Sequence, residues 1–149
     1  MASSAQPVPR FFSVDGVAIR GFDPVGYFRQ GRPVKGEPAF ASEHLGFTFW
    51  HETDETRSVF ESDPKKYAPQ FGGYCAFAMS EGAIATTQPD AWTVSDVATV
   101  PSTFEVHGEL LYLNYSQQVR EKWLPDIERN VQLAHRHWPG ILSGDNTTQ

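Results

Sequence analysis

The sequence predicts a single α+β domain, in which a small antiparallel sheet of hairpins carries helices packed on one side. Three observations lead to this prediction. The chain has 149 residues, a length that suits one domain. It is 40% hydrophobic and 13% aromatic, which is enough apolar surface to build a core. Short apolar runs bounded by turn residues alternate with segments of helical spacing.

The chain is expected to divide into three parts. Residues 1–9 are small, polar and proline-bearing, which is typical of a flexible lead-in. Residues 10–142 contain the predicted domain. Residues 143–149 are polar and are expected to form a loose tail.

The first predicted hairpin spans residues 11–19. Two apolar runs flank Asp15-Gly16, a dipeptide that favours a tight turn. A segment shaped by glycine and proline follows at residues 21–28. Because a residue before proline avoids the helical region, Asp23 is expected to be extended or part of a turn.

The second predicted hairpin joins residues 39–41 to residues 47–51, with its turn near residues 45–46. Side chains alternate between the two faces of a strand. This alternation places His51 on the same face as Phe49.

A helix is predicted directly after this hairpin. Thr53 is a good N-cap, and Phe60 belongs to its buried stripe. The helix should end before Pro64, and residues 65–69 are expected to be a connector.

Short elements are predicted throughout the second half of the chain. The expected strands are residues 92–94, 103–106 and 110–114, with a turn at His107-Gly108. The expected helices are residues 74–80, the segment from the N-cap Ser116 through Trp123, and residues 126–137 with Pro125 at a first-turn position.

Composition argues against several classes of partner. The net charge is −6 and the pI is about 5.3, whereas nucleic-acid-binding proteins concentrate Lys and Arg. No apolar run approaches the roughly 18–20 residues that span a bilayer. The single cysteine excludes an internal disulfide and a four-cysteine zinc site.

No catalytic motif is apparent, so no catalytic residue is predicted. The glycines do not form a phosphate-binding loop. Neither Ser80 nor Ser95 lies in a nucleophile elbow. Whether the protein is an enzyme is left open.

Three motifs, in this order, resemble the YHS domain family in its bacterial single-domain branch. They are residues 21–28, residues 60–76 with the run Gly72-Gly73-Tyr74-Cys75-Ala76, and residues 111–115. The resemblance covers residues 17–142. It implies a fold related to treble-clef-like metal domains and an association with heavy-metal and copper handling. The branch often follows an export signal, which implies a periplasmic location; a short cytoplasmic N-terminus is the alternative.

The chain departs from the metal-binding pattern of that family. Members implicated in metal binding have a cysteine after the Asp-Pro-Val triplet, where this chain has Gly26. Their cysteines after the aromatic strand and one helical turn later correspond to His51 and to Asp54 or Glu55. The resemblance also implies an enlarged hairpin or surface flap at residues 95–105.

Cys75 is the first candidate for chemistry. A thiolate is a nucleophile and a soft metal ligand, and the N-terminus of a helix stabilises its charge. The preceding Gly72-Gly73 would let the backbone approach closely and leave N–H groups free. The alternative is a buried cysteine that acts as a small hydrophobic residue.

Two further side chains are candidate metal ligands beside Cys75. Met79 lies four residues later, on the same face of a helix. His51 is a ligand, a base for Cys75 or a core histidine. Thiolate, thioether and imidazole together suit copper better than magnesium or calcium. Because these ligands are few, an open coordination position or a site shared across a homodimer is expected.

The remaining polar candidates have a structural alternative each. Asp23 either fixes a turn or faces a ligand. Tyr27 and Tyr74 either line a ligand pocket with their hydroxyls or pack in the core. His135 is two residues from His137, so in a helix they point about 200° apart and cannot share a metal; they are interpreted as cations near a helix C-terminus.

Three hypotheses about function follow. The first is a protein that binds a soft transition metal, copper above all, or a small ligand near Cys75. The second is a thiol-based enzyme or redox sensor, in which His51 lowers the pKa of Cys75. The third is an interaction module whose cysteine is buried and inert.

Overall fold

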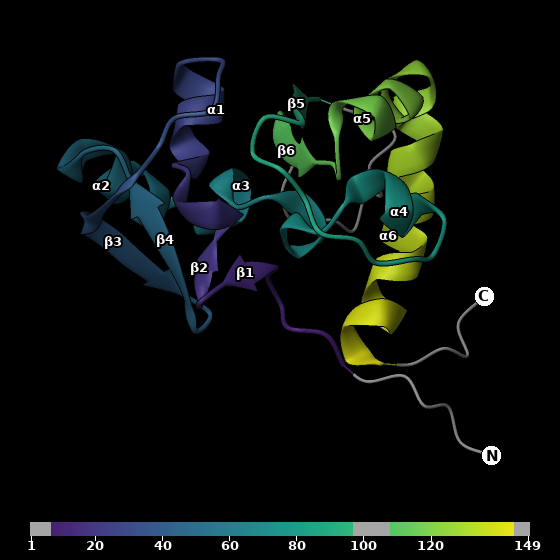
Figure 1. The fold of residues 1–149 in the computed structure, drawn as a ribbon, viewed down its shortest axis with the longest axis horizontal. Coiled ribbons are helices and arrows are strands. Elements are labelled where there is room, and N and C mark those ends of the chain that lie inside the picture. The colour runs from purple at the N-terminus through teal and green to yellow at the C-terminus, as the bar shows by residue number, and fades with distance from the viewer. Residues whose placement is uncertain (1–6, 97–107, 145–149) are drawn as a thin grey trace.

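The computed structural model describes residues 7–96 and 108–144 and confirms the α+β class. In Figure 1, four short strands with helices α1 (Pro24–Arg29) and α2 (Asp54–Ser62) form one half of the molecule. The other half contains two short strands with α4 (Ala76–Ser80), α5 (Gln117–Trp123) and α6 (Ile127–Ser143), and α3 (Pro64–Tyr67) lies between the halves.

The strands form two sheets instead of the single antiparallel sheet that was predicted. The first has the order β1-β2-β4-β3, from β1 (Ser13–Val14), β2 (Val17–Ala18), β4 (Phe47–His51) and β3 (Glu37–His44). β2 pairs with β4 in parallel, because a long crossover that contains α1 separates them. The second sheet pairs β5 (Trp92–Ser95) with β6 (Leu110–Leu113), while the strand expected at 103–106 and His107 lie outside the described residues.

The first two predicted hairpin turns are confirmed, while the third, at His107-Gly108, lies partly outside the described residues. Asp15 and Gly16 have φ of 54° and 80°, and Leu45 and Gly46 have φ of 53° and 86°. Two consecutive positive φ values give the turn whose twist matches the flanking strands. β3 is longer than expected, and its register against β4 shifts between Glu37 and Ala41.

Two of the predicted N-caps are confirmed, and two short helices were missed. The Thr53 side chain accepts from the N–H of Thr56, and the Ser116 side chain accepts from that of Val119. α1 and α3 were not predicted. Each begins at a proline, Pro24 or Pro64, whose fixed φ suits the first helical position.

The three-residue and four-residue turns of 3-10 helix connect the larger elements. They are η1 (Ile19–Gly21), η2 (Gln70–Gly73) and η3 (Leu124–Asp126). η2 occupies the stretch just before Tyr74, so α4 begins only at residue 76 and the predicted helix at 74–80 is too long at its start.

α6 runs six residues beyond its predicted end, through Pro139 to Ser143. His135 therefore lies in the helix interior, and its ring packs on Phe71 with 5.0 Å between centroids. Burial lowers the pKa of His135 to about 4. The interpretation of His135 as a cation near the helix C-terminus is wrong.

The hydrophobic core has two clusters that meet at β6. Leu111 and Leu113 belong to the cluster beneath the four-stranded sheet. Leu110 and Tyr112 belong to the cluster between β6, α4, α5 and α6. Because neighbouring strand residues face opposite ways, all four residues of β6 are buried. β6 is thus the wall shared by the two halves.

Candidate functional site

The structure does not bring the three predicted metal ligands together. His51 ends β4 in one half of the molecule, whereas Cys75 precedes α4 in the other (Figure 1). Among the residues that the structure describes, no three His, Cys, Asp or Glu side chains lie close enough together to hold a metal ion. Two separate polar groups result, one around each residue.

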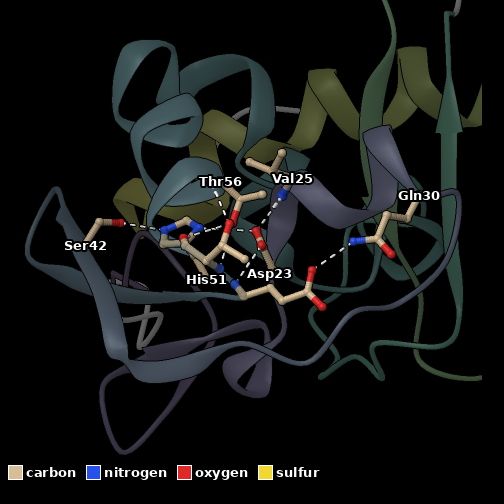
Figure 2. Close-up of polar contacts among 8 residues, drawn as sticks. Asp23, Val25, Gln30, Ser42, His51 and Thr56 are labelled. Carbon is tan, nitrogen blue, oxygen red and sulfur yellow. Dashed lines mark hydrogen bonds and ion pairs between the residues drawn. The ribbon is translucent and has the colours of Figure 1, made fainter.

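The first polar group is a chain of hydrogen bonds from Asp23 through His51 to Ser42 (Figure 2). His51 Nδ1 lies 3.2 Å from Asp23 Oδ1, and His51 Nε2 lies 2.8 Å from Ser42 Oγ. An ionised carboxylate only accepts hydrogen bonds, so Nδ1 carries the proton. In the neutral imidazole, Nε2 then accepts from the Ser42 hydroxyl.

Asp23 is held by four donors, which are His51 of β4, Val25 of α1, Thr56 of α2 and Glu52 between β4 and α2. Its Oδ1 also accepts from the N–H of Val25 at the start of α1, and its Oδ2 accepts from the N–H of Glu52 at 2.9 Å. Burial by itself would raise the pKa of Asp23, but the hydrogen bonds from His51, Glu52 and Thr56 outweigh it. The pKa of this carboxyl is therefore lowered, and Asp23 stays ionised.

The Asp23–His51–Ser42 chain has the connectivity of a Ser-His-carboxylate triad, but its burial points to a structural role. Asp23 and His51 are 0% exposed and Ser42 is 4% exposed. The ring of Phe60 from α2 covers His51 with 5.1 Å between centroids. No acyl substrate can reach Ser42 Oγ in this conformation. The role that remains for these hydrogen bonds is to hold α1, β3 and β4 together.

The second polar group surrounds Cys75, which is the N-cap of α4. Its Sγ accepts from the N–H of Ala78 at 3.5 Å and donates to Oδ1 of Asn114 at 3.5 Å. Its backbone N–H is fixed by Ala85 O at 2.9 Å. The structure therefore confirms that the thiol lies at the start of this short helix.

Burial dominates the protonation of Cys75. The side chain is 1% exposed, and this desolvation raises the pKa of the thiol. The N–H groups of Ala78, Tyr115 and Phe77 act in the opposite direction, because they stabilise the thiolate. At neutral pH Cys75 is a thiol whose S–H donates a hydrogen bond to Asn114 Oδ1.

Asn114 joins α4 to the end of β6. Its Oδ1 also accepts from the N–H of Phe77 at 3.0 Å, so one amide oxygen serves both Phe77 and Cys75. Its backbone N–H donates to Ala91 O, and its carbonyl accepts from the N–H of Gln88. The Asn114 side chain is 0% exposed, and within residues 7–96 and 108–144 its Nδ2 has no hydrogen-bond partner.

Met79 lies in the second core cluster and is 0% exposed. It shares this cluster with Val131 and Ala134 of α6. A thioether in this position fills the space between α4 and α6. No described imidazole lies in the Cys75 group to complete a copper site, since both nitrogens of His51 are bonded to Asp23 and Ser42.

Both tyrosines predicted for a ligand pocket donate hydrogen bonds from their hydroxyls to backbone carbonyls. Tyr27 donates to Pro89 O at 2.7 Å, and Tyr74 donates to Pro9 O at 2.9 Å. Burial raises the pKa of each phenol above its usual range. Each side chain thus packs a connecting segment against the core.

Sequence reasoning missed two residues of these groups, although a signal for each was present. A two-residue turn at Leu45-Gly46 sets the register that places Ser42 opposite Phe49, on the face of His51. Asn114 is the one polar residue that ends the apolar run of β6. A lone polar residue in a buried strand predicts a specific hydrogen-bonding role.

None of the described helices has both the length and the apolar character to cross a membrane. No family model, curated protein or solved structure matches this chain, so the resemblance to the YHS domain family and the treble-clef relation stay predictions.

Proposed function

We propose that the protein is a thiol-based redox protein in which Cys75 is oxidised by small peroxides. The observation that carries this proposal is the polar surrounding of Sγ, which contacts the N–H of Ala78 and the amide of Asn114. N–H donors beside a sulfur stabilise its thiolate, although burial outweighs them here and the pKa of Cys75 stays raised. A cysteine that served only as a hydrophobic residue would not need such neighbours.

His51 has no part in this proposal. Its ring nitrogens are bonded to Asp23 and Ser42, so it does not lower the pKa of Cys75. The backbone N–H groups of Ala78, Tyr115 and Phe77, and not an imidazole, are the groups that stabilise the thiolate.

The segment that follows α4 is bonded to the backbone of Cys75, and its opening would let a small oxidant approach more readily than a large substrate. Residues 81–84 are exposed and belong to no helix or strand, and Ala85, which follows them, holds the N–H of Cys75. Tyr115, whose N–H favours the thiolate, is itself 52% exposed. Local opening of an exposed irregular segment costs little free energy. Because the pKa of the thiol is raised, the reaction is expected to be slow and to accelerate as the pH rises.

Trapping with dimedone, which reacts with sulfenic acid, tests the proposal when dimedone is added in urea after the peroxide has been removed, so that it reaches the buried sulfur. The native protein treated with hydrogen peroxide should give one adduct at Cys75 by mass spectrometry, since the chain has a single cysteine. Cys75→Ser is the control and should give none. A native protein that forms no adduct, while the urea-unfolded chain does, would show an inert thiol and leave the interaction module as the better hypothesis.

Copper binding has less support from this geometry. The described donors near Sγ are amides, and Met79 is sealed in the core. The measurement that separates the two proposals is the copper content after loading of the native protein. A stoichiometric content that falls in both Cys75→Ser and Met79→Leu would favour copper.

A further inference from the structure

The side-chain amide of Asn114 has one satisfied end and one unsatisfied end. Oδ1 accepts two hydrogen bonds, from Phe77 and Cys75, while Nδ2 is buried without a partner among the residues that the structure describes. Rotating the amide by 180° would not help, because its NH₂ group would then face the N–H of Phe77. The orientation of Nδ2 is thereby fixed.

A buried donor without an acceptor costs free energy, and an acceptor placed beside it would recover that cost. Nδ2 is bonded to the same carbon as Oδ1, the atom that contacts Cys75 Sγ at 3.5 Å. An oxygen added to the sulfur would therefore be within reach of this donor. In the reduced protein the sulfur offers no oxygen.

We infer that Asn114 is a positioning residue for oxidised Cys75, whose Nδ2 donates a hydrogen bond to the oxygen that the sulfur gains as a sulfenate. This inference rests on the proposed redox function. It adds that the oxidised state is the sulfenate of Cys75, and that the hydrogen bond from Nδ2 stabilises this sulfenate against reduction and against further oxidation.

The chemical step balances with hydrogen peroxide as the oxidant. The thiol loses its proton, the sulfur electron pair attacks one peroxide oxygen, an S–O bond forms and the O–O bond breaks. The leaving hydroxide takes up a proton, so thiol and peroxide give sulfenic acid and water. Sulfur is oxidised by two electrons, and ionisation of the sulfenic acid gives the oxygen that Nδ2 binds.

The lifetime of the sulfenate in an isosteric variant tests this inference. Asn114→Asp keeps an acceptor for Phe77 and Cys75 but replaces the Nδ2 donor with an oxygen. Loss of a hydrogen bond to a charged group should shorten the dimedone-trappable lifetime by about tenfold or more. Asn130→Asp is the matched control, because it removes the buried Nδ2 donor that bonds Trp123 O in the same half of the molecule. It should lower stability and leave the lifetime unchanged.

A second measurement needs no variant and covers the case in which Asn114→Asp fails to fold. In the wild-type protein, the Asn114 NδH₂ resonances should shift and their hydrogen exchange should slow when Cys75 is oxidised. Unchanged resonances, or equal lifetimes in wild type and Asn114→Asp, would overturn the role of Asn114 while the redox function stood. Absence of any sulfenate in the wild type would instead remove the proposed function.

Discussion

At the residue scale, Asp23 is a buried carboxylate with more donors than a turn requires. Replacing it with Asn removes the charge that His51, Glu52 and Thr56 satisfy. We expect Asp23→Asn to lower the free energy of unfolding by about 3 kcal/mol at pH 7, as for other broken buried pairs. Urea unfolding measures this change, and Asp54→Asn at an exposed position of α2 should cost about 0.5 kcal/mol.

The direction of the pKa shift fixes the pH dependence of this effect. The pKa of Asp23 in the folded protein is below its ordinary value of 3.8. Its contribution to stability is therefore complete above that value and is lost as the pH falls through the lowered pKa. The difference between wild type and Asp23→Asn should narrow in strong acid. A constant difference down to pH 2 would contradict the role of the charge.

Gly72 gives a second prediction at the residue scale. Its φ is 65°, and a Cβ atom there would collide with the backbone oxygen of Arg10. Gly31 has the same φ, but no atom lies within 4 Å of the corresponding position. We expect Gly72→Ala to lower the free energy of unfolding by about 3 kcal/mol, against about 1 kcal/mol for Gly31→Ala. Thermal unfolding of both variants measures this, and equal losses would show that only φ matters.

The sequence indicated that the backbone comes close at Gly72, but not which partner approaches. That partner is Arg10, and the N–H of Phe12 donates to Gly72 O at 2.8 Å. The contact joins residues about sixty positions apart, and no local pattern contains such information. For the same reason Cys75 was recognised from its neighbours in sequence, whereas its acceptor Asn114 was not.

At the scale of elements, the β3–β4 turn contains a residue, Leu45, that its backbone conformation disfavours. Leu45 is 58% exposed and has a φ of 53°, a conformation that disfavours residues other than Gly, Asn and Asp. We expect Leu45→Asn to raise the free energy of unfolding by about 0.5–1 kcal/mol, measured by urea titration. Leu124→Asn is the matched control, because Leu124 is 37% exposed with a right-handed φ of −65° and should gain nothing. Equal effects at both sites would contradict the backbone explanation.

Elements with strong local signals were predictable from the sequence, and those decided by packing were not. The turn of β3–β4 and the N-cap Thr53 were found from short patterns. α6 continues past Pro139 because its apolar face packs on α4 and η2, which offsets the cost of a proline in a helix. The parallel contact of β2 with β4 depends on topology, so the hairpin patterns could not indicate it.

At the scale of the whole molecule, burial of His135 makes stability depend on pH. Its pKa is about 4 in the folded protein, against an ordinary value of 6.5. As the pH falls from 6.5 towards 4, the unfolded chain takes up a proton that the folded chain does not, so stability falls by at most about 1.4 kcal/mol per pH unit. His135→Phe keeps a ring on Phe71 and should flatten this slope. Urea unfolding from pH 4 to pH 7 checks it, and equal slopes would contradict it.

The packing of α4 against α6 has a consequence for biosynthesis. The only sulfhydryl of the nascent chain leaves the ribosome before Asn114, which lies 39 residues later. At 5–20 residues per second, translation of that stretch takes roughly 2–8 s, and α6 emerges after it. During this interval the sulfhydryl lacks the walls that later enclose it. Oxidants and chaperones therefore meet it most freely while the polypeptide is still being translated.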